Sequence, residues 1–380
     1  MQPDIDIFFV SKALNPPFDD SGKLLPFLIV NNLQEFRFHV PVNKGKRVDA
    51  GNVHSMPIFS SDVAYTAGMR DKAALFMAAM LNRSAGILHF FFSPNRMGNR
   101  FGKILSGMRP SLPTVQTIMS LPMQKEGMKG ALFADWVVVW SKLGRQWAEE
   151  AAMAMPEGKR PKIVHIPPGI VPLNPMHEDV KSRLRTELGY SPSRFLVLFP
   201  GDLEFTDTAV TVAHAARQFL REIPATLIMA MRPKTAGART RLKKITEILA
   251  PELADGKVRI LGSIDYFQDL LAITDLVLMP AGSTYAKTDI PLAVLQAMSA
   301  GVPAIVGRGS AMEELAMADA AISVTPGQPE ELAKVVQDLF ADHDRLSNLG
   351  QRAIDYVQDH HTAGIMAQAF ARLYLQILQE

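Results

Sequence analysis

The chain has no cysteine and no long hydrophobic segment, and each absence excludes some classes of protein. Without cysteine it can form neither a disulfide framework nor a cysteine-ligated metal site. Its hydrophobic runs fall far short of the roughly 18 residues expected of a membrane-spanning helix. The first such run, 7–10, follows Asp4 and Asp6, whereas a secretory signal begins with basic residues. We therefore expect a cytoplasmic protein, and peripheral contact with a membrane stays open.

The chain also lacks an excess of charge of one sign. Its 40 Lys and Arg nearly balance its 38 Asp and Glu, and the formal net charge is +2. Nucleic-acid-binding domains usually carry a strong basic excess, so we expect no nucleic-acid partner. The nine histidines show no metal-ligand spacing, and we expect no metal. A length of 380 residues with 48% hydrophobic residues favours two globular domains.

Short hydrophobic runs alternate with amphipathic segments along the whole chain. The runs are continuous rather than alternating, which is typical of parallel strands buried on both faces. Repeated strand–helix units of this kind favour doubly wound sheets. Predicted strands are 5–10, 36–40, 87–92, 114–119, 136–140 and 162–166, then 196–200, 225–229, 258–261, 276–279, 304–306 and 321–324. Predicted helices include 178–188, 211–221, 240–249, 291–300, 329–342 and 363–378.

One proline-rich break divides this pattern. The segment 167–175 contains Pro167, Pro168, Gly169 and Pro175, and cannot hold a helix or an inner strand. We place a domain boundary there, with a first Rossmann-like domain over 1–172 and a second over 173–362. Ligand pockets favour the cleft between two such domains.

The segment 280–303 is the most informative part of the chain. A short strand ends in a polar loop that carries Lys287 and Asp289, and a helix and a second strand follow. The loop and the helix start therefore lie at the carboxyl end of a parallel strand, where open sheets bind ligands.

This segment resembles the nucleotide-sugar loop of the retaining family 4 of GT-B glycosyltransferases. Further similar segments occur in family order and are spread along nearly the whole chain: 12–23, 87–95, 137–147, 164–170, 200–216, 261–282 and 324–353. The resemblance implies an α/β protein of GT-B architecture, with two Rossmann-like doubly wound parallel-sheet domains facing a cleft. It further implies that the first domain binds the acceptor and the second the nucleotide-sugar, and that 363–380 crosses back to the first domain.

Several family positions are substituted here, so the family's E-x7-E motif is degenerate. Thr288 and Gln296 stand where the family has its two glutamates. Asp202 and Asp207 stand where it has an Arg and a Lys for the diphosphate. The family's His-x-His at the fourth strand is reduced to His89. Two acidic side chains cannot bind a diphosphate, so basic residues elsewhere in the chain must bind it.

Three basic residues at predicted carboxyl ends of strands are candidates for that role: Arg232, Lys234 and Lys287. Asp289 would orient Lys287 or accept a bond from a sugar hydroxyl. Each has a plainer alternative, since surface cations, a solvated Lys–Asp pair and a helix cap by Thr288 fit the same sequence. For His89, on an apolar strand, a core histidine is the default interpretation.

The predicted site residues form three groups. The catalytic candidates are Lys287, Arg232 and His89. The acceptor candidates are Lys23, His89 and Asn95. The donor-binding candidates are Gly22, Gly201, Asp202, Arg232, Lys234, Leu261, Lys287, Thr288, Asp289, Ile290, Pro291, Leu292 and Gln296.

The resemblance implies transfer of a sugar, with retention, from a nucleotide-diphospho-sugar to an acceptor hydroxyl, with no metal and no other cofactor. The acceptor is unknown and could be a glycan, a lipid or a small molecule. The alternative is a catalytically impaired GT-B protein that binds a nucleotide or a partner glycosyltransferase. A GT-B epimerase or phosphorylase is a third, weaker hypothesis.

Overall fold

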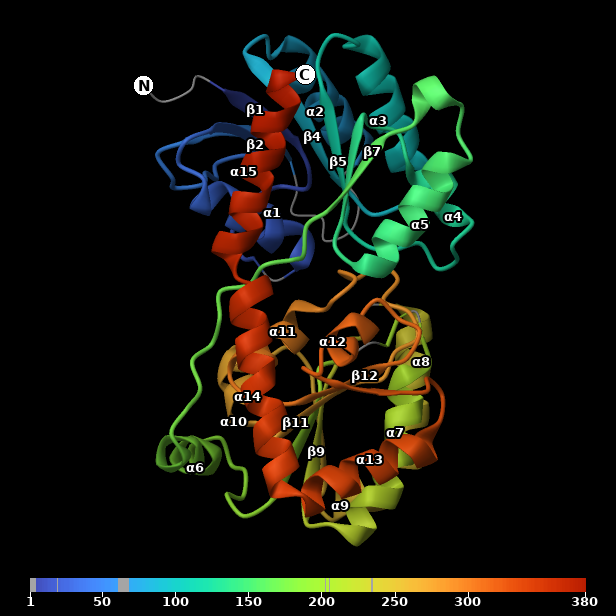
Figure 1. The fold of residues 1–380 in the computed structure, drawn as a ribbon. Helices are drawn as coiled ribbons and strands as arrows, with labels where there is room; N and C mark the ends of the chain where they lie inside the picture. Colours follow the sequence, from blue (N-terminus) through green and yellow to red (C-terminus); the bar gives the residue numbers. More distant parts are fainter. Residues whose placement is uncertain (1–4, 19, 61–67, 202, 205, 234) are drawn as a thin grey trace. The chain divides into compact units, whose positions relative to one another are not determined.

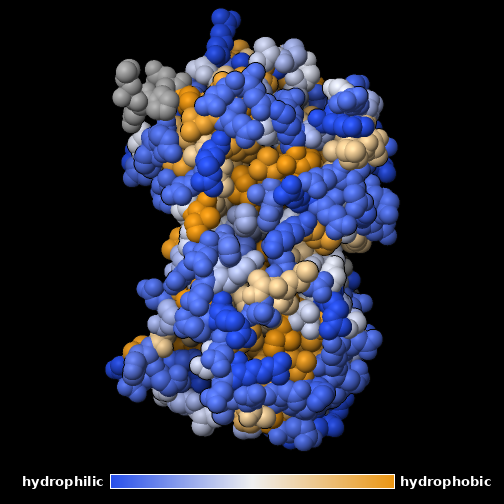
Figure 2. Space-filling model, viewed as in Figure 1, coloured by the Kyte–Doolittle hydropathy of each residue, from blue (hydrophilic) through white to orange (hydrophobic). Residues whose placement is uncertain are grey.

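The computed structural model describes residues 5–18, 20–60, 68–201, 203–204, 206–233 and 235–380. Its internal contacts divide the chain into two units, each described here by itself (Figure 1). Unit 1 comprises Met1–Ile170, Tyr285–Asp289 and His361–Glu380, and unit 2 comprises Val171–Thr284 and Ile290–His360. On the face seen in Figure 2, hydrophilic residues predominate and hydrophobic residues reach the surface in separate patches.

Unit 1 is built on a seven-stranded parallel sheet in the order β3-β2-β1-β4-β5-β6-β7. Its inner strands are hydrophobic on both faces because helices cover both. The strands are β1 (Asp6–Val10), β2 (Arg37–Asn43), β3 (Val53–Phe59), β4 (Ala85–Phe92), β5 (Thr114–Ile118), β6 (Trp136–Val139) and β7 (Lys162–His165). The helices are α1 (Ser21–Asn32), α2 (Met69–Leu81), α3 (Arg96–Met108), α4 (Gly127–Ala131), α5 (Lys142–Met153) and α15 (Ala363–Gln379), with a short 3-10 turn, η1 (Glu157–Lys159).

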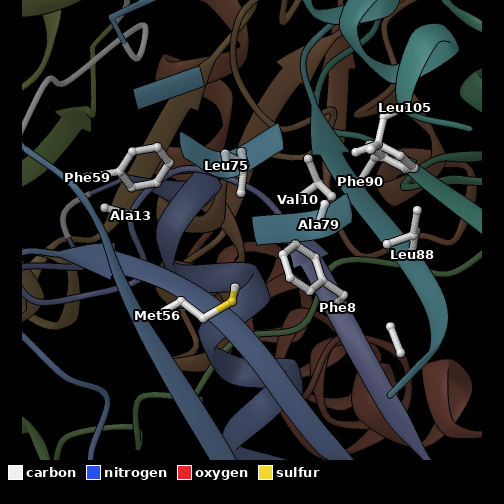
Figure 3. Packing of buried hydrophobic residues seen from close by; sticks show 11 residues of the cluster. Phe8, Val10, Ala13, Met56, Phe59, Leu75, Ala79, Leu88, Phe90 and Leu105 are labelled. Carbon is white, nitrogen blue, oxygen red and sulfur yellow. The ribbon is translucent and has the colours of Figure 1, made fainter. Parts of the chain in front are cut away.

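Alternate side chains of β1 and β4 serve two separate cores. Phe8 and Phe90 pack with Leu75 of α2 and Leu105 of α3 on one face of the sheet (Figure 3). On the other face, Phe9 packs edge-on against His89, and α15 packs against α1. Because successive strand residues point to opposite faces, one short hydrophobic run supplies both cores.

Unit 2 is built on a six-stranded parallel sheet in the order β10-β9-β8-β11-β12-β13. The strands are β8 (Phe195–Phe199), β9 (Ala225–Ala230), β10 (Val258–Leu261), β11 (Leu276–Met279), β12 (Ala304–Gly307) and β13 (Ile322–Val324). The helices are α6 (Glu178–Glu187), α7 (Thr208–Glu222), α8 (Ala236–Ile248), α9 (Ala250–Ala254), α10 (Phe267–Ile273), α11 (Leu292–Ser299), α12 (Glu313–Met317), α13 (Pro329–Ala341) and α14 (His343–His360).

The predicted fold class, two doubly wound parallel sheets, is confirmed. All twelve predicted strands occur within three residues of their expected ends, but β3 was not predicted. This edge strand has a half-exposed sequence with an internal proline, Pro57, so it lacks the continuous hydrophobic run of the inner strands.

The contacts separate the units between Ile170 and Val171, whereas the sequence predicted a boundary after residue 172. They also assign Tyr285–Asp289 to unit 1, although the sequence analysis placed this loop in the second domain. Hydrogen bonds from Leu121 and Ser141 to Asp289, described below, account for this assignment. The final helix belongs to unit 1 as well, because Tyr374 bonds to His89. No helix among the described residues is long and apolar enough to cross a bilayer.

Candidate functional site

The sheet of unit 2 reverses its strand order between β8 and β11. The chain leaves β8 toward β9 on one side and returns through β11 on the other. Loops that leave such neighbouring strands in opposite directions open a crevice at the carboxyl edge, the usual binding place in doubly wound folds. Here those loops are 200–207 and 280–291, which carry most of the donor-binding predictions.

Gly201 follows β8 and adopts a backbone conformation that favours glycine. Its φ is 63°, and a Cβ there would lie 2.5 Å from the carbonyl oxygen of Ala230. The loop after β8 therefore passes close over the end of β9, and a side chain would force the two backbones apart. The backbone geometry therefore explains the glycine at position 201 without reference to a ligand.

Arg241 of α8, which the sequence analysis did not identify, braces the same loop. Its guanidinium donates to the carbonyl oxygens of Leu203 and Glu204, at 2.9 and 3.1 Å. It also forms an ion pair with Asp207 at 3.1 Å, at the start of α7. Asp207, which stands where the resemblance implies a lysine, is thus paired with a cation of another helix. No spacing rule in the sequence links positions 207 and 241, so only the tertiary structure reveals this pair.

The remaining predicted residues at this edge lie at strand ends. Arg232 follows β9 and is exposed, and Leu261 ends β10 and is half-buried. Asp202 and Lys234 lie outside the described residues.

The start of α11 differs from the prediction. The helix begins at Leu292, and Pro291 is its N-cap residue and supplies no side-chain cap. The alternative that Thr288 caps this helix is therefore wrong, because Thr288 lies three residues before the cap position. Ile290 and Pro291 are buried, Leu292 is half-buried, and Gln296 is half-buried one turn further along the helix.

Asp289 anchors its loop to unit 1. Its Oδ1 accepts the backbone N–H of Leu121 at 3.0 Å, and its Oδ2 accepts the hydroxyl of Ser141 at 2.7 Å. Ser141 in turn accepts the N–H of Gly144 and so caps α5. The carboxylate is 1% exposed. Both carboxylate oxygens accept buried donors of unit 1, which gives Asp289 a structural role, and its predicted part toward Lys287 or a sugar hydroxyl stays a prediction.

The two residues before Asp289 are placed differently from each other. Lys287 is half-buried. Thr288 is 1% exposed, and its Oγ1 has no hydrogen-bond partner among the described residues. A buried hydroxyl without a partner is uncommon in folded proteins. The donor-binding role of Thr288 stays a prediction, and its hydroxyl has no competing partner among the described residues.

Unit 1 has its own reversal of strand order, between β1 and β4. The loop after β1 ends at Asp20, the N-cap of α1, whose Oδ1 accepts the N–H of Lys23 at 3.1 Å. Lys12 approaches the other oxygen of Asp20 at 3.3 Å. A Cβ on Gly22 would lie 2.9 Å from Asp20 Oδ1, so glycine keeps this helix start compact. The structure thus gathers Gly22 and Lys23 at the edge where the sequence placed them.

Asn95, the third acceptor candidate, caps a helix. It follows β4, and its Oδ1 accepts the N–H of Gly98 at 2.7 Å while its Nδ2 donates to the carbonyl of Ser93. Both ends of the side-chain amide are occupied, so a capping role accounts for this residue.

His89 is a core histidine. It is fully buried, its Nδ1 bonds to the hydroxyl of Tyr374 and its Nε2 to that of Thr117, both at 2.7 Å. Burial holds the pKa of His89 well below its ordinary value of 6.5, so the ring is neutral. The predicted catalytic and acceptor roles of His89 are not supported, because the ring has no exposed atom and both nitrogens have partners.

Two surface grooves of unit 2, of about 760 and 380 Å³, lie along α7 and α13. Neither is lined by a predicted site residue. Among the residues that the structure describes, no three His, Asp or Glu side chains cluster as metal ligands would.

The two Rossmann-like units define the GT-B fold, and comparisons with known proteins agree. Sucrose-phosphate synthase from Thermosynechococcus elongatus has a TM-score of 0.74 to this chain at 17% identity, with 99% of each chain covered. Anabaena Alr3699/HepE in complex with UDP-glucose has a TM-score of 0.74 at 16% identity, covering 98% of this chain and all of the other. At these identities the similarity shows the fold alone.

Residues 194–342 match the family model of the glycosyl transferases group 1. Two sequence relatives are a Bacillus anthracis N-acetyl-alpha-D-glucosaminyl L-malate synthase, 23% identical, and a Corynebacterium glutamicum GDP-mannose-dependent monoacylated alpha-(1-6)-phosphatidylinositol monomannoside mannosyltransferase, 25% identical. The alignments cover 52% and 57% of this chain, and they span only 50% and 57% of those relatives. The family match covers the sheet of unit 2, less than half of the chain, whereas the fold similarity covers nearly the whole chain.

Proposed function

We propose that this protein transfers a sugar from a nucleotide-diphospho-sugar to an acceptor hydroxyl, with retention of configuration. The observation that carries the proposal is the family match over 194–342, which spans the whole sheet of unit 2 and both loops of its strand-order reversal. One sequence relative is named as a GDP-mannose-dependent mannosyltransferase and the other as an N-acetyl-alpha-D-glucosaminyl L-malate synthase, and each is matched over about half its length.

In this proposal the donor diphosphate binds at the carboxyl edge of unit 2. Negative charge grows on the leaving diphosphate as the glycosidic bond breaks, so fixed cations and helix amides stabilise the transition state. Arg232 at the end of β9 would supply such a cation. The first amides of α11 would supply dipoles, since Pro291 offers them no side-chain cap. Lys287 and Lys234 are further proposed cations for the diphosphate, although Lys234 lies outside the described residues.

The acceptor binds in this proposal at the carboxyl edge of unit 1, beside Gly22 and Lys23. The retaining mechanism we favour places the acceptor on the same face as the leaving group, and the departing phosphate takes the acceptor's proton. Such a mechanism requires no carboxylate base and no metal. The substitution of the family glutamates by Thr288 and Gln296 then weakens sugar binding without removing the chemistry.

Calorimetric titration with UDP-, GDP- and ADP-sugars tests the donor assignment, followed by an assay for slow donor hydrolysis in the presence and absence of EDTA. We expect one nucleotide class to bind, and turnover to persist in EDTA. Arg232→Gln should weaken binding about tenfold, since a hydrogen bond to a charged group contributes about 1.5 kcal/mol or more. Arg345→Gln, an exposed arginine on α14, is the matched control and should bind like the parent. Absence of binding for all three classes would refute the proposal.

A second candidate is a GT-B protein that binds a nucleotide or a partner glycosyltransferase without turnover. The observation that favours it is the ion pair of Asp207 with Arg241, which leaves an acid where the family has a lysine. Tight nucleotide binding with no hydrolysis and no transfer would select this candidate.

A further inference from the structure

The outward side of α2 and α3 in unit 1, here named the α2–α3 face, exposes hydrophobic side chains. Thirteen large hydrophobic residues are exposed among the described residues, and six of them lie on these two thirteen-residue helices. Each of the six is 53–75% exposed: Met69, Met77, Leu81, Met97, Ile104 and Met108.

Two of these side chains on each helix lie in one row. Met77 and Leu81 lie four residues apart on α2, and Ile104 and Met108 lie four apart on α3. Residues at this spacing are neighbours on a helix surface. The opposite sides of both helices bury Leu75, Ala79 and Leu105 in the sheet core, as Figure 3 shows, so the outward rows lie outside that core.

The two helices lie side by side and make one continuous surface. Lys72 Nζ of α2 is 3.1 Å from Met97 Sδ of α3. The rings of Phe76 and Phe101 are 6.0 Å apart in an edge-to-face arrangement. After α3, Arg109 donates to the carbonyl oxygen of Ala79 at 2.9 Å and ties the helix ends together.

Among the described residues of this surface, the exposed charges are basic. Residues 68–113 contain seven Lys and Arg but one acidic residue, Asp71. Asp71 is only 4% exposed and accepts the N–H and hydroxyl of Ser60. The neighbouring α4 adds an exposed Lys129, opposed by the exposed Glu126 at its cap. The exposed basic residues of the face are Arg70, Arg83, Arg96, Arg100 and Lys103.

We propose that the α2–α3 face binds peripherally to the surface of a membrane that contains anionic lipid. Hydrophobic rows flanked by basic side chains suit the headgroup boundary, where apolar groups insert and Lys and Arg reach the phosphates. The positive charge is spread over both helices rather than gathered around a pocket. A surface of distributed negative charge matches that pattern better than a single anionic ligand does.

Vesicle co-sedimentation of the full chain tests the proposal, with phosphatidylcholine vesicles that contain or lack 30% phosphatidylglycerol. No sugar nucleotide is needed, so the result is independent of the proposed transferase activity. We expect binding to the anionic vesicles, weak binding to pure phosphatidylcholine, and release as salt is raised.

Two paired variants separate charge from hydrophobic contact. Arg100→Gln with Lys103→Gln should weaken binding about thirtyfold, at about 1 kcal/mol for each cation near the surface. Ile104→Ser with Met108→Ser should weaken it about tenfold through lost apolar insertion. The matched controls carry Arg239→Gln with Lys244→Gln on α8, and Met153→Ser with Met317→Ser on α5 and α12, and should bind like the parent.

Four results would overturn the proposal. The first is failure of the parent chain to bind anionic vesicles at low salt. The second is equal loss of binding in the control variants. The third is competition by polyglutamate with no effect of the hydrophobic pair, as expected for an acidic protein partner. The fourth is a parent dimer that does not bind vesicles and that Ile104→Ser with Met108→Ser converts to a monomer, which would make this face a contact between copies.

Discussion

Replacement of Asp289 by alanine should destabilise unit 1 although position 289 lies far along the chain from its partners. The carboxylate accepts two buried bonds, at 3.0 Å from Leu121 and 2.7 Å from Ser141. A hydrogen bond to a charged group contributes about 1.5–3 kcal/mol, and its loss leaves a buried donor unpaired. We therefore expect Asp289→Ala to lower the free energy of unfolding of unit 1 by about 3–5 kcal/mol.

Tryptophan fluorescence isolates this effect. The three tryptophans of the chain, Trp136, Trp140 and Trp147, all belong to unit 1. Urea unfolding followed by their emission thus reports unit 1, while circular dichroism reports both units. Asp49→Ala is the control, since that carboxylate is 93% exposed and 3.9 Å from Arg47, and should change stability by less than about 0.5 kcal/mol.

A double-mutant cycle with Ser141→Ala assigns the effect to the contact itself. The two substitutions should be non-additive, with a coupling energy of about 1–2 kcal/mol. If Asp289→Ala costs less than about 1 kcal/mol, or if the two substitutions simply add, then the loop is not anchored through this carboxylate. The assignment of Tyr285–Asp289 to unit 1 would lose its physical basis.

Three further predictions concern burial and backbone geometry. The buried, neutral His89 should make unit 1 less stable in acid, because below about pH 6.5 the unfolded chain gains a proton that the folded ring does not. Unit 1 should therefore lose up to about 1.4 kcal/mol of stability per pH unit as the pH falls. Unfolding of His89→Gln, followed by fluorescence, should show a shallower dependence of stability on pH. Gly201→Ala should lower the free energy of unfolding, measured by circular dichroism, by about 3 kcal/mol or more. The control Gly256→Ala, at a position with φ +67° and open space around the added Cβ, should lower it by about 1–2 kcal/mol. Equal losses would contradict the close approach of Gly201 to Ala230. Thr288→Val should leave stability within about 1 kcal/mol of the parent and raise the KM for the donor. Thr117→Val is the contrast, because it removes a hydroxyl that bonds to His89 and should lower stability by about 1–3 kcal/mol. An unchanged KM in Thr288→Val would exclude a ligand contact.

The site could be predicted from the sequence only at the level of strand ends. Gly201, Arg232 and Leu261 lie at the carboxyl ends of their strands as expected, because a parallel strand followed by a polar loop determines the edge on which the loop emerges. Bonds between residues distant in the chain could not be predicted. Arg241 reaches Asp207 across 34 positions, and Asp289 reaches Ser141 across 148.

The sequence by itself determined the two parallel sheets, since buried strands must be hydrophobic along their whole length and that pattern is visible without coordinates. It missed β3, because an edge strand faces solvent and carries no such pattern. Only the tertiary structure decided which polar residues are already occupied. His89 and Asp289 were predicted as site residues, yet both are buried and bonded to distant partners, whereas the hydroxyl of Thr288 has no hydrogen-bond partner among the described residues. The side chain determines which bonds a residue can form, but whether those bonds remain open to a ligand depends on partners that folding brings from elsewhere in the chain.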